Sequence, residues 1–165
     1  MARDAIRHYL ATGKLLDVSG RPDDRPAQGV FVSLHEHGAD EGGLRGCVGS
    51  IVPSQPSLCA EIVHQAVNAA TSDPRFPPIR AEDVDDLQVT VYLLDPPVPV
   101  DSIDDLDPSR YGIIVESRTG RRALLLPAIP GIVTARQQVE VTKRKAFIGE
   151  NEPVRLYRFE AEILN

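Results

Sequence analysis

The sequence predicts an α+β protein, in which a mainly antiparallel sheet packs with helices in one compact unit. Two observations support this class: apolar residues recur at helical spacing in three segments, and two pairs of strand-like runs are joined by glycine-containing turns. Hairpins pair their strands antiparallel, and a mixture of hairpins with helices is typical of α+β folds. The 165 residues, 42% of them hydrophobic, suffice for a substantial core. We therefore expect a single domain over residues 1–165.

The N-terminal third of the chain predicts a helix, a loop and a hairpin. An amphipathic helix is expected over the first dozen residues, where apolar side chains recur before a Thr-Gly stop. Residues 17–28 carry prolines and aspartates that are typical of a loop. The β-branched and aromatic runs at 29–37 and 44–52 predict two strands, and the sequence GADEGG at 38–43 predicts the turn between them.

The remaining two thirds predict a second set of helices and strands. Apolar residues at positions 58, 62, 66 and 69 share one helical face, and the prolines that follow cannot continue helical hydrogen bonding. Alternation of apolar and polar residues marks the later strands. The expected elements are a helix over 58–73, an extended connector over 74–80, a strand within 81–97, a second hairpin over 111–127, a helix over 133–147 and a final strand over 153–164.

Charge and cysteine content narrow the possible functions. The formal net charge of −6 argues against binding of duplex DNA, which requires broad neutralisation of phosphates. No apolar run approaches the length of a membrane span or of a secretory signal, so we expect no membrane partner and a cytoplasmic location. With two cysteines, Cys47 and Cys59, a disulfide framework is not expected. The chain also carries no Walker loop, dinucleotide fingerprint or nucleophile elbow.

The stretch Leu44–Ser50, LRGCVGS, carries the main candidate for chemistry. Strand alternation puts Arg45, Cys47 and Gly49 on one face. A thiolate is the reactive form of cysteine and a neighbouring cation stabilises it, so this face is consistent with a reactive thiol supported by Arg45. The alternative is structural, because a cysteine thiol is commonly buried and strand glycines mark close packing. On these residues alone the structural interpretation is preferred.

Two histidines, His35 and His37, reach this motif only in one register of the predicted hairpin. A slip of one residue would move them to the other face of the sheet. They also offer half of a metal site, but zinc needs further nitrogen or sulfur ligands, so no metal site is predicted. The pairs in the assumed register are His35 with Cys47, His37 with Arg45 and Ser33 with Gly49.

Two further segments offer binding groups. In SDPRFPP, Asp73 is expected to cap a turn or to pair with a basic residue, and Phe76 to anchor the proline connector in the core. Alternatively, this stiff segment forms the wall of a pocket. The basic run Lys143–Lys145 lies near a predicted helix end, where positive charge complements the helix dipole. A solvated helix end is the preferred interpretation of that run, with an RNA or phosphate contact as the alternative.

Taken together, these segments resemble the AMMECR-type family, also called AmmeMemoRadiSam system protein A. The resemblance covers nearly the whole chain and depends most on LRGC at 44–47, with DPRFPP downstream at 73–78. It implies an α+β fold in which a larger lobe of sheet and helices packs against a smaller lobe. It also implies an association with Memo-type and radical S-adenosylmethionine proteins, and it assigns no activity and no cofactor. Further matching segments are ARDAIRHYL, GVFVSLHEHG, DDLQVTVYLLDPP and RLYRFEAEIL.

The expected function is therefore a binding or accessory subunit that meets those partners through the surface of the LRGC motif. The alternative is an enzyme in which Cys47, supported by Arg45, acts as a nucleophile or redox thiol on a small molecule or modified nucleotide. RNA binding ranks below both because the chain is acidic. The binding residues expected from the two motifs are Leu44, Gly46, Gly49, Asp73, Arg75 and Phe76.

Overall fold

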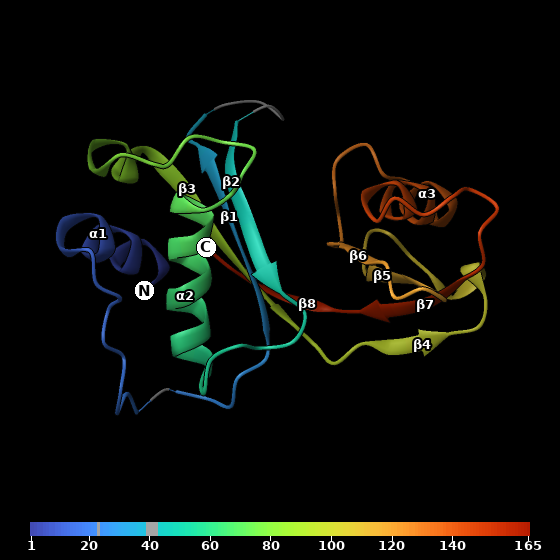
Figure 1. Ribbon diagram of the computed structural model, residues 1–165, viewed down its shortest axis with the longest axis horizontal. Helices are drawn as coiled ribbons and strands as arrows, with labels where there is room; N and C mark the ends of the chain where they lie inside the picture. The colour runs from blue at the N-terminus through green and yellow to red at the C-terminus, as the bar shows by residue number, and fades with distance from the viewer. Residues whose placement is uncertain (23, 39–42) are drawn as a thin grey trace. The chain divides into compact units, whose positions relative to one another are not determined.

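The computed structural model describes residues 1–22, 24–38 and 43–165, and it confirms the α+β class. The chain divides into two compact units, each with its own four-stranded sheet (Figure 1). Unit 1 comprises residues 1–94 and 162–165, and unit 2 comprises residues 95–161. The single domain expected over residues 1–165 stays a prediction.

Unit 1 is a sheet with helices on one face. In this sheet the strands follow the order β2-β1-β3-β8, so β2 and β8 are its edges. Helix α2 contacts β1 and β2, and α1 contacts α2 (Figure 1). The predicted first hairpin is confirmed, whereas its predicted turn falls largely on residues 39–42, outside the described residues. The elements are α1 (Ala2–Thr12), β1 (Gly29–Glu36), β2 (Leu44–Ser50), α2 (Leu58–Thr71), the 3-10 helix η1 (Ala81–Asp86), β3 (Leu87–Leu94) and β8 (Ala161–Leu164).

The core of unit 1 follows the period-two pattern of its strands. The side chains of Val30, Val32 and Leu34 on β1 are completely buried, and they alternate with residues that point to the opposite face. Leu87 and Leu93 continue the same buried face on β3, as the sequence predicted. Helix α2 covers this face with Leu58, Ile62, Ala66 and Ala69, the four positions expected to share one helical side.

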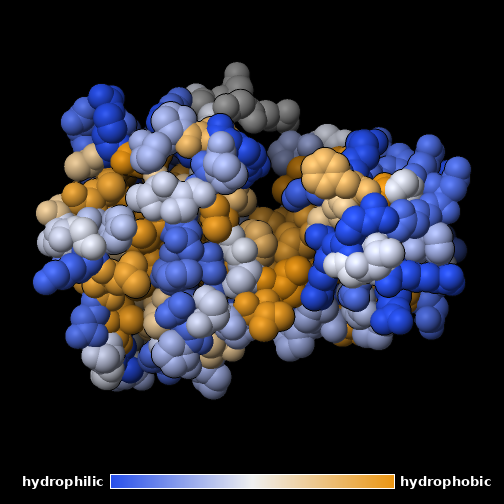
Figure 2. All heavy atoms as spheres, viewed as in Figure 1, coloured by the Kyte–Doolittle hydropathy of each residue, from blue (hydrophilic) through white to orange (hydrophobic). Residues whose placement is uncertain are grey.

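Unit 2 is a sheet packed with one helix, in the strand order β4-β7-β5-β6. The predicted second hairpin is confirmed as β5 paired with β6. Helix α3 begins at a capping box, in which Thr134 and Gln137 satisfy each other's backbone N–H groups. Hydrophilic residues cover most of the face of this unit in Figure 2. The elements are β4 (Val98–Val100), the 3-10 helix η2 (Ile103–Asp105), β5 (Gly112–Ser117), β6 (Arg122–Leu125), α3 (Ala135–Lys145) and β7 (Val154–Phe159).

The prediction of one final strand over 153–164 is wrong. This segment forms two strands, β7 and β8, which belong to different sheets and are separated at Glu160. The backbone carbonyl of Glu160 accepts a hydrogen bond from the N–H of Asp95, 2.9 Å away. The residue between the strands is therefore held by the segment that leaves β3.

Candidate functional site

The glycines of the LRGC motif allow close packing. A Cβ atom at Gly46 would lie 2.1 Å from the backbone oxygen of Ala69 on α2. A Cβ atom at Gly49 would lie 2.3 Å from the ring of Phe31 on the neighbouring strand. Neither distance is possible for a real side chain, so these glycines let α2 and an aromatic ring pack directly on β2. Gly46 and Gly49 therefore have the structural role that the sequence allowed, close packing of the strand.

The predicted register of the first hairpin is wrong. Ser33 lies opposite Cys47, two positions from the predicted Gly49. His35 lies opposite Leu44, three positions from the predicted Cys47, because an irregularity between Leu34 and His35 adds one further position. The shift keeps Ser33 and Cys47 on a common face of the sheet. His35, two residues from Ser33 on β1, points to this face as well, and its Nε2 atom is 2.8 Å from the Ser33 hydroxyl oxygen.

The DPRFPP segment holds β2 at Cys47. The N–H of Cys47 donates to Asp73 Oδ2 at 2.8 Å, and the carbonyl of Cys47 accepts from Arg75 Nη2 at 3.2 Å. Arg75 in turn donates to both carboxylate oxygens of Asp73, from Nε at 2.9 Å and from Nη2 at 2.7 Å. Because β2 is an edge strand, this pair satisfies backbone groups that a further strand would otherwise bind. We call the Asp73–Arg75 pair the edge clamp.

The edge clamp also determines how the Cys47 side chain is presented. Because the backbone groups of Cys47 point outward to the clamp, Cys47 and Ser33 form the non-hydrogen-bonded type of antiparallel pair, in which side chains lie closer together. In the same register Phe31 lies beside Gly49 and Tyr92. Phe31, Ser33, Cys47 and Tyr92 therefore share the sheet face that α1 and α2 do not cover, which we call the thiol face.

Hydrogen bonding keeps the edge clamp charged. The side-chain hydrogen bonds from Arg75 hold the pKa of Asp73 at about 2, below its ordinary 3.8, with help from the backbone N–H groups of Cys47 and Arg75 and against the effect of burial. The carboxylate raises the pKa of Arg75, and Coulomb interaction with the Cys47 side chain adds to this shift. Burial raises the pKa of Tyr92, and Coulomb interaction with the Cys47 side chain again contributes. The thiol thus lies within electrostatic reach of a guanidinium and a phenol.

Arg45 is held by a different partner. Its guanidinium forms an ion pair with Glu36 at 2.7 Å, while the hydrogen bonds to the Cys47 backbone come from the edge clamp. Arg75, by contrast, contacts the cysteine residue at its backbone carbonyl. The sequence placed Arg75 among the binding residues without linking it to Cys47, because nothing in the spacing of 28 positions reveals that contact.

Phe76 does not anchor the proline connector in the core. Its side chain is only half-buried, and its ring lies under the guanidinium of Arg75, with 5.2 Å from the guanidinium carbon to the ring centroid. Ile79, 2% exposed, is the residue that enters the core. The N–H of Ile79 donates to the carbonyl of Ala70 at 2.8 Å, which fixes the connector against the end of α2.

Sequence reasoning missed a buried carboxylate behind the motif. Glu61 on α2 is completely buried and accepts hydrogen bonds from the hydroxyl of Ser50, the N–H and hydroxyl of Ser54, the N–H of Gln55 and the amide of Gln65, at 2.7–3.2 Å. Burial favours the neutral acid, but these hydrogen bonds outweigh it and lower the pKa of Glu61. The position of a glutamate on the apolar face of a predicted helix was the signal that could have revealed it.

The basic run at the end of α3 is solvated at Arg144 and Lys145 but not at Lys143. Lys143 is 8% exposed, and its ammonium donates to the carbonyls of Glu150 and Glu152. The Lys145 ammonium donates to the carbonyl of Leu124 at 2.9 Å. Both lysines therefore hold segments around α3, and Arg144 and Lys145 are the exposed members of the run that was considered for RNA.

Other candidate features are structural or lie apart from the motif. Cys59 is buried against α1, and its N–H donates to Asp24 at 3.0 Å. In the described part of the chain, no group of three or more histidine, cysteine or acidic side chains is arranged to hold a metal ion. Among the same residues, no helix has the length and apolar character needed to cross a bilayer.

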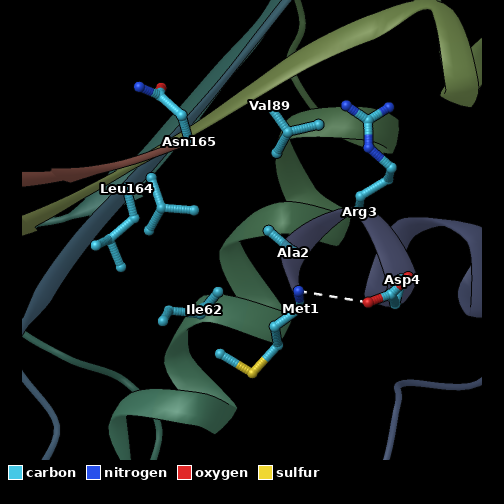
Figure 3. A pocket seen from close by; sticks show the side chains of 9 residues that line it. Met1, Ala2, Arg3, Asp4, Ile62, Val89, Leu164 and Asn165 are labelled. Carbon is cyan, nitrogen blue, oxygen red and sulfur yellow. Dashed lines mark ion pairs between the residues drawn. The ribbon is translucent and has the colours of Figure 1, made fainter.

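A pocket of about 350 Å³ lies at the start of α1, between this helix, α2 and the β3–β8 edge (Figure 3). Its wall is mainly apolar, with Ile62, Val89 and Leu164 facing the space. The ammonium of Met1 is paired with Asp4 at 3.4 Å. None of the site residues predicted from the sequence lines this pocket.

Comparison with known proteins gives consistent matches over the whole chain. A family model described as AMMECR1 matches residues 1–164. A protein of Thermotoga maritima is 42% identical, with 95% of this chain and 90% of that protein covered. A protein of Clostridium acetobutylicum is 34% identical over 96% of this chain, which spans only 34% of its length. The crystal structure of an uncharacterised protein of Pyrococcus horikoshii has a TM-score of 0.89 at 33% identity, covering 98% of this chain and 86% of that one.

Proposed function

The chain belongs to the AMMECR1 family, and from that premise we propose that it is a cytoplasmic binding or accessory subunit working with Memo-type and radical S-adenosylmethionine proteins. The partner would contact the thiol face and the edge clamp. The observation that carries the proposal is that the edge clamp fixes the backbone of Cys47 while the residue remains partly exposed. A rigid, partly accessible side chain on a sheet face is suited to recognition.

The chemistry of the neighbouring groups favours binding over catalysis. A general base works best when its pKa lies near the operating pH. Asp73 has a pKa of about 2 and already accepts hydrogen bonds from Arg75 and from the backbone of Cys47, so it is a poor proton acceptor at neutral pH. Arg45 is engaged by Glu36. The motif residues are thus used to hold the strand.

Co-purification from the native host tests this function. Tagged wild-type protein is compared with Cys47→Ala and Arg45→Ala, and with Arg80→Gln as a control that removes an exposed guanidinium from unit 1. We expect a Memo-type or radical S-adenosylmethionine protein to be recovered with the wild type and the control, and to be lost with Cys47→Ala while the fold stays intact. Recovery of no partner, or equal recovery with every variant, would count against the proposal.

One contact favours the enzymatic alternative. The hydroxyl of Ser33 lies directly across the strand pair from Cys47 and is hydrogen-bonded to the imidazole of His35 at 2.8 Å. Such a pair offers a route for the thiol proton, since a base oriented by a neighbour is the usual means of activating a nucleophile. Intact-mass measurement after mild alkylation tests it. If native Cys47 stays unlabelled while the unfolded chain reacts, the nucleophile is excluded.

A further inference from the structure

We propose that the group bound next to Cys47 is an anion, such as a carboxylate or phosphate, and that Arg75 holds it. This inference rests on the proposed binding role of the motif surface and names the chemistry that the surface accepts. It is drawn from the edge clamp, whose two charges differ in how far they reach solvent. Asp73 is buried and Arg75 is exposed, so the pair is neutral as a whole but presents its positive end outward.

The carboxylate of the edge clamp is fully used inside the protein. The Asp73 side chain is 3% exposed, and its two oxygens accept from the Arg75 guanidinium and from the backbone N–H groups of Cys47 and Arg75. A ligand therefore finds no acceptor there. A cation approaching this point would meet a guanidinium and no available carboxylate.

The guanidinium of the edge clamp keeps donors for a ligand. The Arg75 side chain is 55% exposed, and its hydrogen bonds to the described residues use Nε and Nη2, which leaves the two N–H groups of Nη1. The Phe76 ring and Asp73 fix the plane of the group. A planar fork fixed in advance suits an anion with two oxygens, because less side-chain freedom is lost on binding.

The Cys47 thiol lies close enough to Arg75 to interact electrostatically with an anion bound there. Arg75 donates to the carbonyl of Cys47 and interacts electrostatically with its side chain. Tyr92, whose pKa is raised, keeps its proton at neutral pH and lies on the same sheet face, opposite Phe31 on β1. An anion on Arg75 would thus lie beside Cys47, even though the chain as a whole carries a net charge of −6.

Charged thiol reagents test the proposal in the intact protein. Three methanethiosulfonates are used, which carry a sulfonate, a neutral or a trimethylammonium group. In each, the Cys47 thiolate attacks the sulfenyl sulfur, the new S–S bond forms, methanesulfinate leaves with the electrons of the broken S–S bond, and the thiol proton passes to solvent. Peptide mapping locates the label, and the unfolded chain supplies the intrinsic rate of each reagent.

We expect native Cys47 to favour the sulfonate over the ammonium reagent by about fivefold to tenfold, relative to the unfolded chain, from the Coulomb energy of one charge at close range. High salt should reduce this preference by screening. A native ratio equal to that of the unfolded chain, or a preference for the ammonium reagent, would overturn the inference.

Substitution of the edge clamp connects the preference to Arg75. Arg75→Gln alone leaves Asp73 as a buried charge without its partner and risks unfolding, so the double variant Asp73→Asn/Arg75→Gln is made as well. We expect a folded double variant to lose the preference and Arg80→Gln, the matched control, to keep it. Persistence of the preference in the double variant would assign it to another group and end the proposal.

Two arms separate the sources of the anion. If the anion belongs to a small molecule, inorganic phosphate should slow the labelling of wild-type Cys47 and leave the double variant unaffected. If it belongs to an acidic side chain of a partner, the co-purified partner should protect Cys47 only when Arg75 is present. Partner recovery that depends on Cys47, without any charge preference, would refute the anion and leave the proposed function standing. A charge preference without recovery of any partner would support the anion and count against the proposed function.

Discussion

Cys47 is held by a segment that is far from it in the sequence, the end of α2 and the edge clamp that follows it. Its N–H and carbonyl are bound by Asp73 and Arg75, and the next residue upstream, Gly46, packs against the backbone of α2. Each contact depends on the others, since the helix that presses on Gly46 also leads into the edge clamp. The motif residues are thus coupled through packing before any ligand is considered.

Gly46→Ala should strongly destabilise unit 1. The new Cβ would lie 2.1 Å from the backbone oxygen of Ala69, so α2 or β2 must move, at a cost of about 1–3 kcal/mol or more. The matched control is Gly149→Ala, where the new Cβ would meet only Glu152, at 3.9 Å. Urea unfolding midpoints measure both. Equal small shifts in the two variants would contradict the packing role of Gly46.

Asp73→Asn should remove a pH-dependent part of the stability. Since the folded pKa of about 2 lies below the ordinary 3.8, the carboxylate stabilises the fold above pH 4, and this contribution is lost as the pH falls towards 2. At about 1.4 kcal/mol per pKa unit, the contribution is about 2 kcal/mol. Chemical unfolding at pH 7 and pH 2.5 should show a large difference between wild type and variant at pH 7 and a small one at pH 2.5. The exposed Asp101→Asn serves as the control, and a difference independent of pH would contradict the role of this charge.

The residues of the site could be found from the sequence, but their relations could not. LRGC and DPRFPP were visible as motifs, whereas the hydrogen bond between Cys47 and Arg75 spans 28 positions and depends on how α2 returns to β2. Arg45 was favoured as the cation because it is close in sequence, yet Glu36 holds it. Tyr92 was overlooked. The alternation of β3 already placed it on the side of the strand that faces away from the core.

At the scale of elements, regular patterns were predictable and irregular ones were not. The buried side of β3 and the apolar face of α2 followed from their periodicity. The register of β1 with β2 did not, because a slip of two residues keeps the same side chains on each face, and the irregularity after Leu34 leaves no sequence signal. The division of the last predicted strand at Glu160 was also missed, since an extended segment keeps its alternation when it passes from one sheet to another.

Glu61→Gln should loosen the segment between β2 and α2. The carboxylate accepts at both oxygens, at Oε2 from the N–H groups of Ser54 and Gln55 and at Oε1 from Ser50 and Gln65. A glutamine amide has a single oxygen, so the donors at one of these two positions would face an N–H group. We expect a loss of about 1–3 kcal/mol, the usual cost of an unsatisfied buried group. Hydrogen exchange should accelerate most in residues 51–57. The exposed Glu82→Gln is the control, and unchanged exchange in this segment would refute the role of Glu61.

At the scale of the whole molecule, the two units have separate cores. The core of unit 1 forms between α1, α2 and the strands β1 and β3, while that of unit 2 gathers around β5 and α3. Each unit also completes its own sheet. Separate cores allow local opening of one unit without the other, because the free energy of opening depends on the contacts that are broken.

Ile113→Ala tests whether the units unfold separately. Ile113 is completely buried in the core of unit 2, so its truncation should cost about 2–5 kcal/mol. Hydrogen exchange measured by mass spectrometry should accelerate in residues 95–161 and stay unchanged in residues 1–94. Leu34→Ala, at an equally buried position of unit 1, should give the opposite pattern. If either variant accelerates exchange evenly along the chain, the two cores open together, and the protein behaves as the single cooperative domain that its length predicts. If the two patterns stay separate, partner binding at the motif can stabilise unit 1 alone, because a ligand stabilises only the state whose contacts it uses.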